Sequence, residues 1–174
     1  MADRLNKTLE RRFSNSLEFL HAASPPPARI LDLGTPNELG RRMQLAGYEV
    51  TNTEGDLEQV TTPLGEDADL VVAFEILEHL VSPYNVLCAI KAPRLIATVP
   101  LRLWFASAYC NPSDPWDRHF HEFEDWQFDW LLEQAGWKII RTEKWTSYGA
   151  LVGIRPLLRR FTPRYYAVEA IRSD

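Results

Sequence analysis

Three short apolar runs constrain the fold of this chain most strongly. Residues 29–33, 69–74 and 95–99 read RILDL, DLVVAF and LIATV. Each run is short enough for a strand and too continuously apolar for a strand with one face in water. Between them, residues 38–46 and 82–90 have apolar side chains at helical spacing. Buried strands that alternate with helices are typical of a mostly parallel sheet with helices on both faces, so the sequence predicts an α/β fold.

The remaining elements lie on either side of these runs. Residues 3–20 have leucine and phenylalanine at three- and four-residue spacings, which predicts an amphipathic helix that ends before the prolines at 25–27. Further strands are expected at 48–52, 137–142 and 165–171, and a further helix at 128–135. We expect one domain of 174 residues, with an N-terminal helix (1–24), a core (28–143), and a basic connector with the last strand (144–174).

Composition excludes several classes of protein. With 45% hydrophobic and 25% charged residues the chain is typical of a globular domain. No segment approaches the roughly 18 apolar residues of a membrane span, and the first residues lack the apolar stretch of a secretory signal. Only two cysteines, Cys88 and Cys110, are present, so we expect reduced thiols and a cytoplasmic protein. A net charge of −5 argues against nucleic acid as a partner, and no pattern specifies an oligomeric state.

The turn after the first strand is a candidate ligand site. The sequence from 31 to 40 reads LDLGTPNELG, a run of small and polar residues that leads into a helix. In parallel sheets the ligand lies at the carboxyl ends of the strands, where the strand order reverses. Glu54 follows Gly34 by 20 residues, a spacing at which an acidic side chain can bind ribose hydroxyls. This pattern favours a nucleotide-like ligand.

At this point the sequence resembles the class I S-adenosylmethionine-dependent methyltransferases, in their small-molecule and ubiquinone-type branch. The similar segments are ILDLG, GYEVTNTEGD, DADLVVAFEILEHLVSP, LIATVP and HEFEDWQFDWLLEQAGWKII, which occur in this order within about residues 28–143. The resemblance implies a Rossmann-like, doubly wound sheet of the seven-stranded type. It also implies methyl transfer from S-adenosyl-L-methionine to a small molecule by direct displacement at the sulfonium methyl.

The same resemblance implies roles for particular residues. Asp32, Gly34 and Thr35 would line the methionine end of the cofactor, and Glu54 would accept hydrogen bonds from its ribose. Phe74 and Glu75 would lie beside the transferring methyl group. Such a reaction needs in-line placement of the acceptor more than it needs a strong base.

The first motif departs from the family pattern. Thr35-Pro36-Asn37-Glu38 replaces two further glycines, Pro36 has no amide hydrogen, and Glu38 adds a negative charge. The stretch from Glu54 to Asp69 is too short for a helix and a strand, so the sheet is expected to be trimmed there. A protein with this fold that binds or assembles without catalysis is therefore the alternative function.

A second group of polar residues follows the strand at 69–74. Glu75, Glu78 and His79 would share one face at helical spacing, and His121 comes near from a later segment. Two carboxylates with one or two histidines suit a divalent ion, and small-RNA 2′-O-methyltransferases have a similar Glu-x-x-Glu-His element. Metal-assisted RNA methylation is thus a weaker alternative. In the implied methyl transfer, Glu75, His119 or His121 would assist deprotonation or orientation of the acceptor, with either histidine as a candidate general base. A structural role for both histidines is the alternative, and the sequence favours it over a role as metal ligand or base.

Two further segments have more than one interpretation. Trp104, Tyr109 and Trp116 belong either to a substrate pocket or to ordinary packing. The arginines at 155, 159, 160 and 164 flank apolar residues. They form either a solvated helix face or a basic amphipathic segment that contacts anionic lipid or phosphate.

Overall fold

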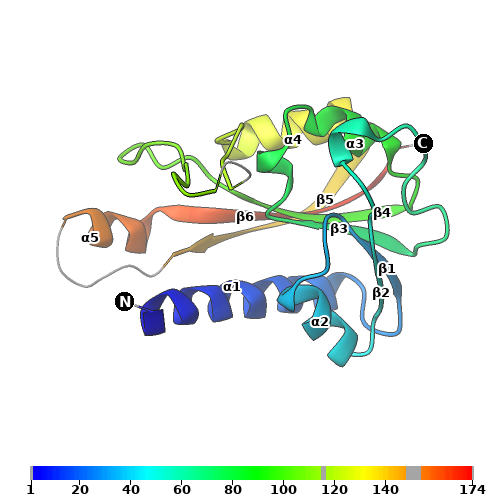
Figure 1. Ribbon diagram of the computed structural model, residues 1–174, viewed down its shortest axis with the longest axis horizontal. Helices are drawn as coiled ribbons and strands as arrows, with labels where there is room; N and C mark the ends of the chain where they lie inside the picture. Colours follow the sequence, from blue (N-terminus) through cyan, green and yellow to red (C-terminus); the bar gives the residue numbers. More distant parts are fainter. Residues whose placement is uncertain (1, 115–116, 148–153, 174) are drawn as a thin grey trace.

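A computed structural model describes residues 2–114, 117–147 and 154–173, and its centre is one six-stranded sheet (Figure 1). The strands are β1 (Arg29–Asp32), β2 (Glu49–Asn52), β3 (Leu70–Phe74), β4 (Arg94–Pro100), β5 (Trp137–Thr146) and β6 (Pro163–Arg172). Their order is β2-β1-β3-β4-β6-β5. The first four run parallel, and β6 is antiparallel to both of its neighbours. The predicted mostly parallel sheet is confirmed.

Helices cover both faces of this sheet, as the sequence predicts. They are α1 (Ala2–Ala23), α2 (Glu38–Leu45), α3 (Pro83–Ala89), α4 (Asp125–Gln134) and α5 (Ile154–Phe161), with 3₁₀ turns η1 (Leu57–Gln59) and η2 (Leu77–His79). Helices α1 and α2 lie on one face, and α3 and α4 on the other (Figure 1). Phe19 and Met43 belong to the buried cluster on the first face, and Leu87 and Phe128 to that on the second. The two layers of apolar contacts explain why the central strands are apolar on both sides.

The sheet is trimmed where the sequence is short. Between β2 and β3 the described chain forms only the turn η1, so β2 is an edge strand and the sheet has six strands.

Some local expectations differ from the structure. Ser82 is the N-cap of α3 but makes no side-chain cap hydrogen bond, so Pro83 at the first helical position is the effective start signal. Strand β5 continues to Thr146, because it pairs with β6 beyond the predicted end at 142.

No helix in the described ranges combines the length and the apolar character needed to cross a membrane.

Candidate active site

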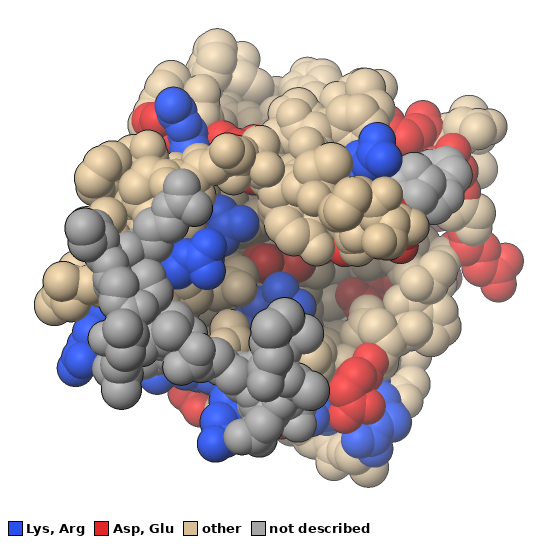
Figure 2. Space-filling view, turned by 60° about the vertical axis from the view of Figure 1, so that its left-hand side comes forward, with Lys and Arg blue, Asp and Glu red and all other residues tan. Residues whose placement is uncertain are grey.

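The carboxyl ends of β1, β3 and β4 meet at one edge of the sheet. The strand order reverses at β1, which has β2 on one side and β3 on the other. Ligands of open α/β sheets bind outside this edge. Figure 2 shows that this face is hollowed and that basic and acidic side chains lie at the bottom of the hollow. The chemistry of the site therefore depends on the segments that follow these three strands and on α1, which borders them.

The turn between β1 and α2 is held by residues at the end of β2. Gly34 has a φ of 100°, a conformation that favours glycine. Its amide donates to Thr53 Oγ1 over 2.7 Å, and its carbonyl accepts from Asn52 Nδ2 over 3.1 Å. Asn37 caps α2, because its Oδ1 accepts from the amide of Gly40 at 3.0 Å. The turn is thus formed without the further glycines of the family pattern.

Asp32 lies beneath this turn and is almost completely buried. Its exposed fraction is 3%, and its Oδ2 accepts from Asn52 Nδ2 at 3.3 Å and from Asn37 Nδ2 at 3.5 Å. Burial raises the pKa of Asp32 to about 6, although the two amides oppose the shift. A Cβ at Gly40 would lie 3.4 Å from Oδ2, so Gly40 leaves room for the carboxylate. Asn37 and Asn52 are thus neighbours of Asp32 that were not identified from the sequence.

The charge of Glu38 is compensated within α2. Glu38 forms ion pairs with Arg41 at 2.8 Å and with Arg42 at 3.0 Å. Hydrogen bonds from these arginines lower the pKa of Glu38 to about 2. The exposed Thr35 presents its carbonyl to Asn37 Nδ2 at 3.3 Å. The two arginines therefore reduce the negative field that Glu38 would impose on an anionic ligand group.

Glu54 is exposed just after β2, beside an open pocket of about 500 Å³. The pocket is also lined by Leu31, Thr53 and Asp56, and it continues along the segment to Gly65. This segment is where the short chain between β2 and β3 leaves out a helix and a strand. Glu54 is therefore placed at the strand end where a ribose-binding carboxylate is expected, and its side chain is free to turn toward a ligand.

Phe74 and Glu75 lie at the end of β3. Phe74 is half-buried, and Glu75 has a φ of 53°, which is the left-handed region and is uncommon for a residue with a side chain. Oε2 of Glu75 lies 3.4 Å from Nη1 of Arg12 in α1. Burial raises the pKa of Glu75, and the charge of Arg12 opposes that shift. The strained backbone makes this strand end a candidate functional position. No sequence signal links Arg12 to it.

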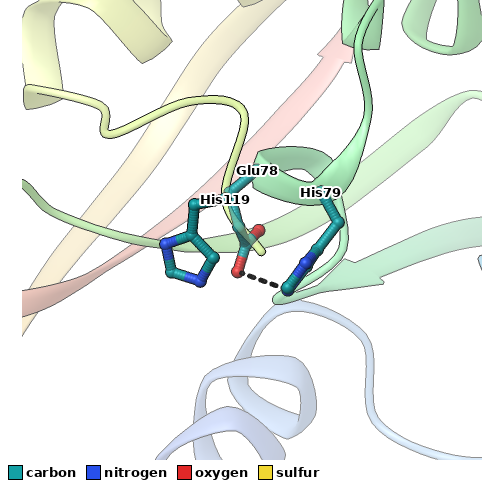
Figure 3. Close-up of side chains that lie close together, drawn as sticks. All are labelled: Glu78, His79 and His119. Carbon is teal, nitrogen blue, oxygen red and sulfur yellow. Dashed lines mark ion pairs between the residues drawn. The ribbon is translucent and has the colours of Figure 1, made fainter. Parts of the chain in front are cut away.

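Glu78 and His79 in η2 form a compact cluster with His119 from the segment after β4 (Figure 3). One ligating atom from each lies within 4.8 Å of the others. His79 Nε2 is 3.8 Å from Glu78 Oε1, and the two imidazole rings meet edge to face with centroids 4.9 Å apart. Glu78 and His79 lie in the 3₁₀ turn η2, whereas Glu75 precedes it with a positive φ. The expected helical face with all three residues 75, 78 and 79 therefore does not form.

Backbone contacts join the two segments of the cluster. The carbonyl of Glu78 accepts from the amides of Phe120 at 2.8 Å and His121 at 3.2 Å. Nδ1 of His79 lies 3.0 Å from the carbonyl oxygen of Arg118. These bonds place the segment after β4 directly against η2, although about forty residues separate them in the sequence.

The electrostatic state of the cluster follows from its burial. Glu78 is 1% exposed, and its Oε2 has no hydrogen-bond partner among the described residues. Burial, together with the charge of Glu75, raises the pKa of Glu78 well above its usual range. Burial also lowers the pKa of His119, whose Nδ1 lies 3.0 Å from Oε1 of Glu122. His119 is therefore neutral near pH 7.

Glu122 contacts the cluster through His119, and it was not proposed as a site residue from the sequence. Its Oε1 also accepts from the amide of Tyr109 at 2.9 Å, and its Oε2 lies 3.7 Å from Nη1 of Arg164. These partners fix the carboxylate that orients His119. The three-residue spacing between His119 and Glu122 was the available signal.

The cluster fits the donor set of a divalent ion. One carboxylate and two imidazoles are ligands that zinc or manganese accepts. The Nδ1 atoms of His79 and His119 face oxygen acceptors, as is usual when the other ring nitrogen binds a metal. His119, not His121, completes the set: Nε2 of His121 lies 3.3 Å from the carbonyl oxygen of Val81, and its ring stacks on Phe123.

The aromatic residues after β4 that could line a substrate pocket are exposed where the structure describes them. Trp104 is 73% exposed and Tyr109 is 43% exposed, so neither is enclosed in a pocket among the described residues. Tyr109 lies beside His119, with ring centroids 5.0 Å apart. Trp116 lies outside the described residues.

No family model and no curated protein matches this chain in sequence. Its structure is similar to that of the Burkholderia thailandensis 1,6-didemethyltoxoflavin-N1-methyltransferase, solved with its namesake compound and S-adenosylhomocysteine. The TM-score is 0.62 at 16% identity, over 94% of this chain and 79% of the other. The Synechocystis magnesium protoporphyrin IX methyltransferase with bound S-adenosylmethionine gives 0.61 at 15% identity, over 98% and 83%. The chain has the class I S-adenosylmethionine-dependent methyltransferase fold. The [4+2]-cyclase SpnF is also similar in structure, with a TM-score of 0.63 at 12% identity, over 92% of this chain and 81% of the other.

Proposed function

We propose that this protein transfers the methyl group of S-adenosylmethionine to a small molecule. The observation that carries the proposal is the buried acid–base cluster at the strand ends of a methyltransferase-fold sheet, with His119 held by Glu122 at 3.0 Å. The names of two structural neighbours describe methyltransferases of small molecules, 1,6-didemethyltoxoflavin and magnesium protoporphyrin IX, and support an acceptor of that size. A cytoplasmic location remains our expectation from the composition.

The cofactor side of the proposed site consists of the turn after β1 and the end of β2. Asp32 would accept from the ammonium group, Gly34 and Thr35 would border the methionine end, and Glu54 would accept from the ribose hydroxyls. The residues fit this role, because a buried carboxylate, a glycine of positive φ and an exposed carboxylate follow adjacent strands. When bound, the cofactor would supply an electrophilic methyl group on its sulfonium.

The acceptor side consists of Phe74, Glu75 and the His119–Glu122 pair. If Nδ1–H of His119 donates a hydrogen bond to Glu122, the Nε2 lone pair would face an acceptor hydroxyl or amine. As the acceptor atom is methylated, His119 would take up its proton on Nε2 and hold it as the imidazolium beside Glu122. Phe74 and Glu75 would border the methyl group and orient the acceptor.

Calorimetric titration of the purified protein with S-adenosylhomocysteine tests this proposal. We expect saturable binding in the micromolar range. Absence of heat at millimolar ligand, from a sample shown to be folded, would contradict the proposal. It would favour the second candidate, a binding or assembly protein without catalysis, which is supported by Pro36 in the altered turn and by the absence of its amide hydrogen.

A divalent ion at Glu78, His79 and His119 is a further candidate for the same site. It would act as a Lewis acid on the acceptor oxygen, a role compatible with RNA 2′-hydroxyls as the weaker alternative acceptor. Titration with Mn²⁺ or Zn²⁺, with His79→Gln as the variant and the exposed His21→Gln as the control, tests the site. We expect a metal-dependent rise in melting temperature that His79→Gln abolishes. An identical response of both variants would exclude the cluster as the ligand set.

A further inference from the structure

Helix α5 presents apolar side chains to solvent. Its sequence is IRPLLRRF, and Leu157 and Phe161 are 57% and 74% exposed. Residues four apart lie on the same side of a helix, so these two form one apolar stripe. Among the large hydrophobic side chains described as exposed, Phe161 has the highest exposed fraction. In α1 and α2, by contrast, Phe19, Leu20 and Met43 are buried against the sheet.

The sequence around this stripe has charges of one sign, although Lys144 and Arg164 pair with Asp125 and Glu122 from other segments. Between Glu143 and Glu169 the sequence has five basic residues and no acidic residue, although the whole chain has a net charge of −5. Arg159 and Arg160 are exposed in the last turn of α5, and neither has an ion-pair partner in the part of the chain that the structure describes. The chain therefore concentrates positive charge beside its most exposed apolar side chains.

A second segment adds apolar groups at the same end of the molecule. Trp104 and Phe120, in the segment after β4, are 73% and 65% exposed. The amide of Leu101 donates to the carbonyl of Arg164 over 2.7 Å. The segment after β4 and the connection between α5 and β6 are therefore hydrogen-bonded to each other where they leave the sheet. Figure 1 shows both projecting beyond the same end of the sheet, at the left. The exposed α5 residues Leu157, Arg159, Arg160 and Phe161 are named the apolar-basic end, and the segment after β4 lies at the same end of the sheet.

We propose that the apolar-basic end docks on the surface of membranes that contain anionic phospholipid. Arginine side chains beside exposed Phe and Leu are the combination that binds at the boundary between headgroups and acyl chains. The helix is short and the anchors are few, so docking is peripheral, reversible and weakened by salt. This surface lies at the edge of the sheet that holds the candidate active site, but the proposal does not depend on methyl transfer.

Vesicle co-sedimentation tests the proposal with the full chain. Vesicles of phosphatidylcholine with and without phosphatidylglycerol are compared at low and high salt. We expect the protein to sediment with the phosphatidylglycerol vesicles at low salt only. Arg159→Gln with Arg160→Gln should lower the partition coefficient by about 30-fold, the effect expected for two arginines near an anionic surface. Phe161→Ser should lower it by roughly tenfold through lost apolar burial.

Leu45→Ser is the matched control, because Leu45 is 73% exposed but belongs to α2, away from the apolar-basic end. It should sediment like the unmodified chain. Binding that is absent at low salt, or that the arginine and phenylalanine variants leave unchanged, would overturn the proposal. Concentration-dependent dimerisation that Phe161→Ser removes, without vesicle binding, would overturn it in favour of a second copy as the occupant.

Discussion

The two sides of the candidate active site are built differently. On the cofactor side, Asp32, Gly34 and Glu54 lie within 23 consecutive residues. Hydrogen bonds of Gly34 with Thr53 and Asn52 join the end of β1 to the end of β2. On the acceptor side, Glu75 contacts Arg12 from α1, and Glu78 contacts the segment at 118–121. The cofactor side is local in the sequence, whereas the acceptor side is assembled by packing.

This difference has a consequence for charge. On the cofactor side, Glu54 is exposed and Glu38 is neutralised by neighbours in its own helix. Asp32 is buried, but its Oδ2 accepts from two asparagines. Glu78 on the acceptor side is buried and has an oxygen atom without a partner among the described residues. A buried carboxylate with an unfilled oxygen is costly unless it is protonated or binds a ligand. We therefore expect substitutions on the acceptor side to affect chemistry and those on the cofactor side to affect binding.

The largest expected effect is on the acceptor side. His119→Gln should lower kcat by about 10²- to 10⁴-fold, the usual contribution of a general base, and leave the Kd of S-adenosylhomocysteine unchanged. The readout is transfer of labelled methyl to an acceptor found by screening, with calorimetry for binding. His121→Gln is the control, because His121 lies against Val81 and Phe123, outside the cluster. Equal loss in both variants would contradict the assignment.

The same assignment fixes a pH dependence. His119 acts as a base only when neutral, and burial lowers its pKa from the usual 6.5. The kcat of the unmodified protein should therefore not depend on pH around pH 7, and it should fall only below about pH 6.5. Histidine NMR titration measures the same pKa without an acceptor. An apparent pKa above the usual histidine value would contradict the burial argument.

The next effect is on the cofactor side. Glu54→Gln should weaken S-adenosylhomocysteine binding by about 10- to 100-fold, since it removes charge-assisted hydrogen bonds to two hydroxyls. Calorimetry measures the change. Asp56→Asn is the matched control, because Asp56 lines the same pocket as Glu54 and is also exposed. If Asp56→Asn has the larger effect, the ribose carboxylate has been assigned to the wrong residue.

Asp32 connects binding with stability. Its pKa is raised from 3.8 to about 6 by burial, so the folded state binds more protons than the unfolded state between these values. Asp32 should therefore contribute a fall in the free energy of unfolding as pH rises from about 4 to about 6, on the order of 2 kcal/mol. Other carboxyl groups add their own pH dependence, so the readout is the difference between Asp32→Asn and the unmodified protein, measured by urea unfolding at several pH values. Asp32→Asn should lose this contribution and bind S-adenosylhomocysteine more weakly, whereas the exposed Asp67→Asn should keep the slope of the unmodified protein. An unchanged slope in Asp32→Asn would exclude a raised pKa of Asp32.

Features that are local in the sequence could be predicted, whereas features assembled by packing could not be predicted in full. The apolar runs predicted β1, β3 and β4 within a residue or two, because burial on both faces leaves a local signature. The missing helix and strand between β2 and β3 followed from chain length alone. The cluster followed only in part: Glu78 and His79 were expected together, but His119 takes the place expected for His121. Glu75 was expected in a helix with Glu78, but it has a φ of 53° and contacts Arg12. Contacts between segments forty or more residues apart leave no periodic signal in the sequence.

The smallest expected effect tests whether the turn on the cofactor side is fixed before the ligand arrives. Thr53→Val keeps the side-chain shape but removes the acceptor for the Gly34 amide, a bond of 2.7 Å. The free energy of unfolding should fall by about 1 kcal/mol, and S-adenosylhomocysteine binding should weaken by about fivefold, because the turn must then be ordered by the ligand. Thr62→Val, an exposed threonine in the wall of the same pocket, is the control for both measurements. Loss of stability with unchanged affinity would show that the ligand does not use the Gly34 turn. The cofactor side would then have to be placed closer to the buried cluster around Glu78.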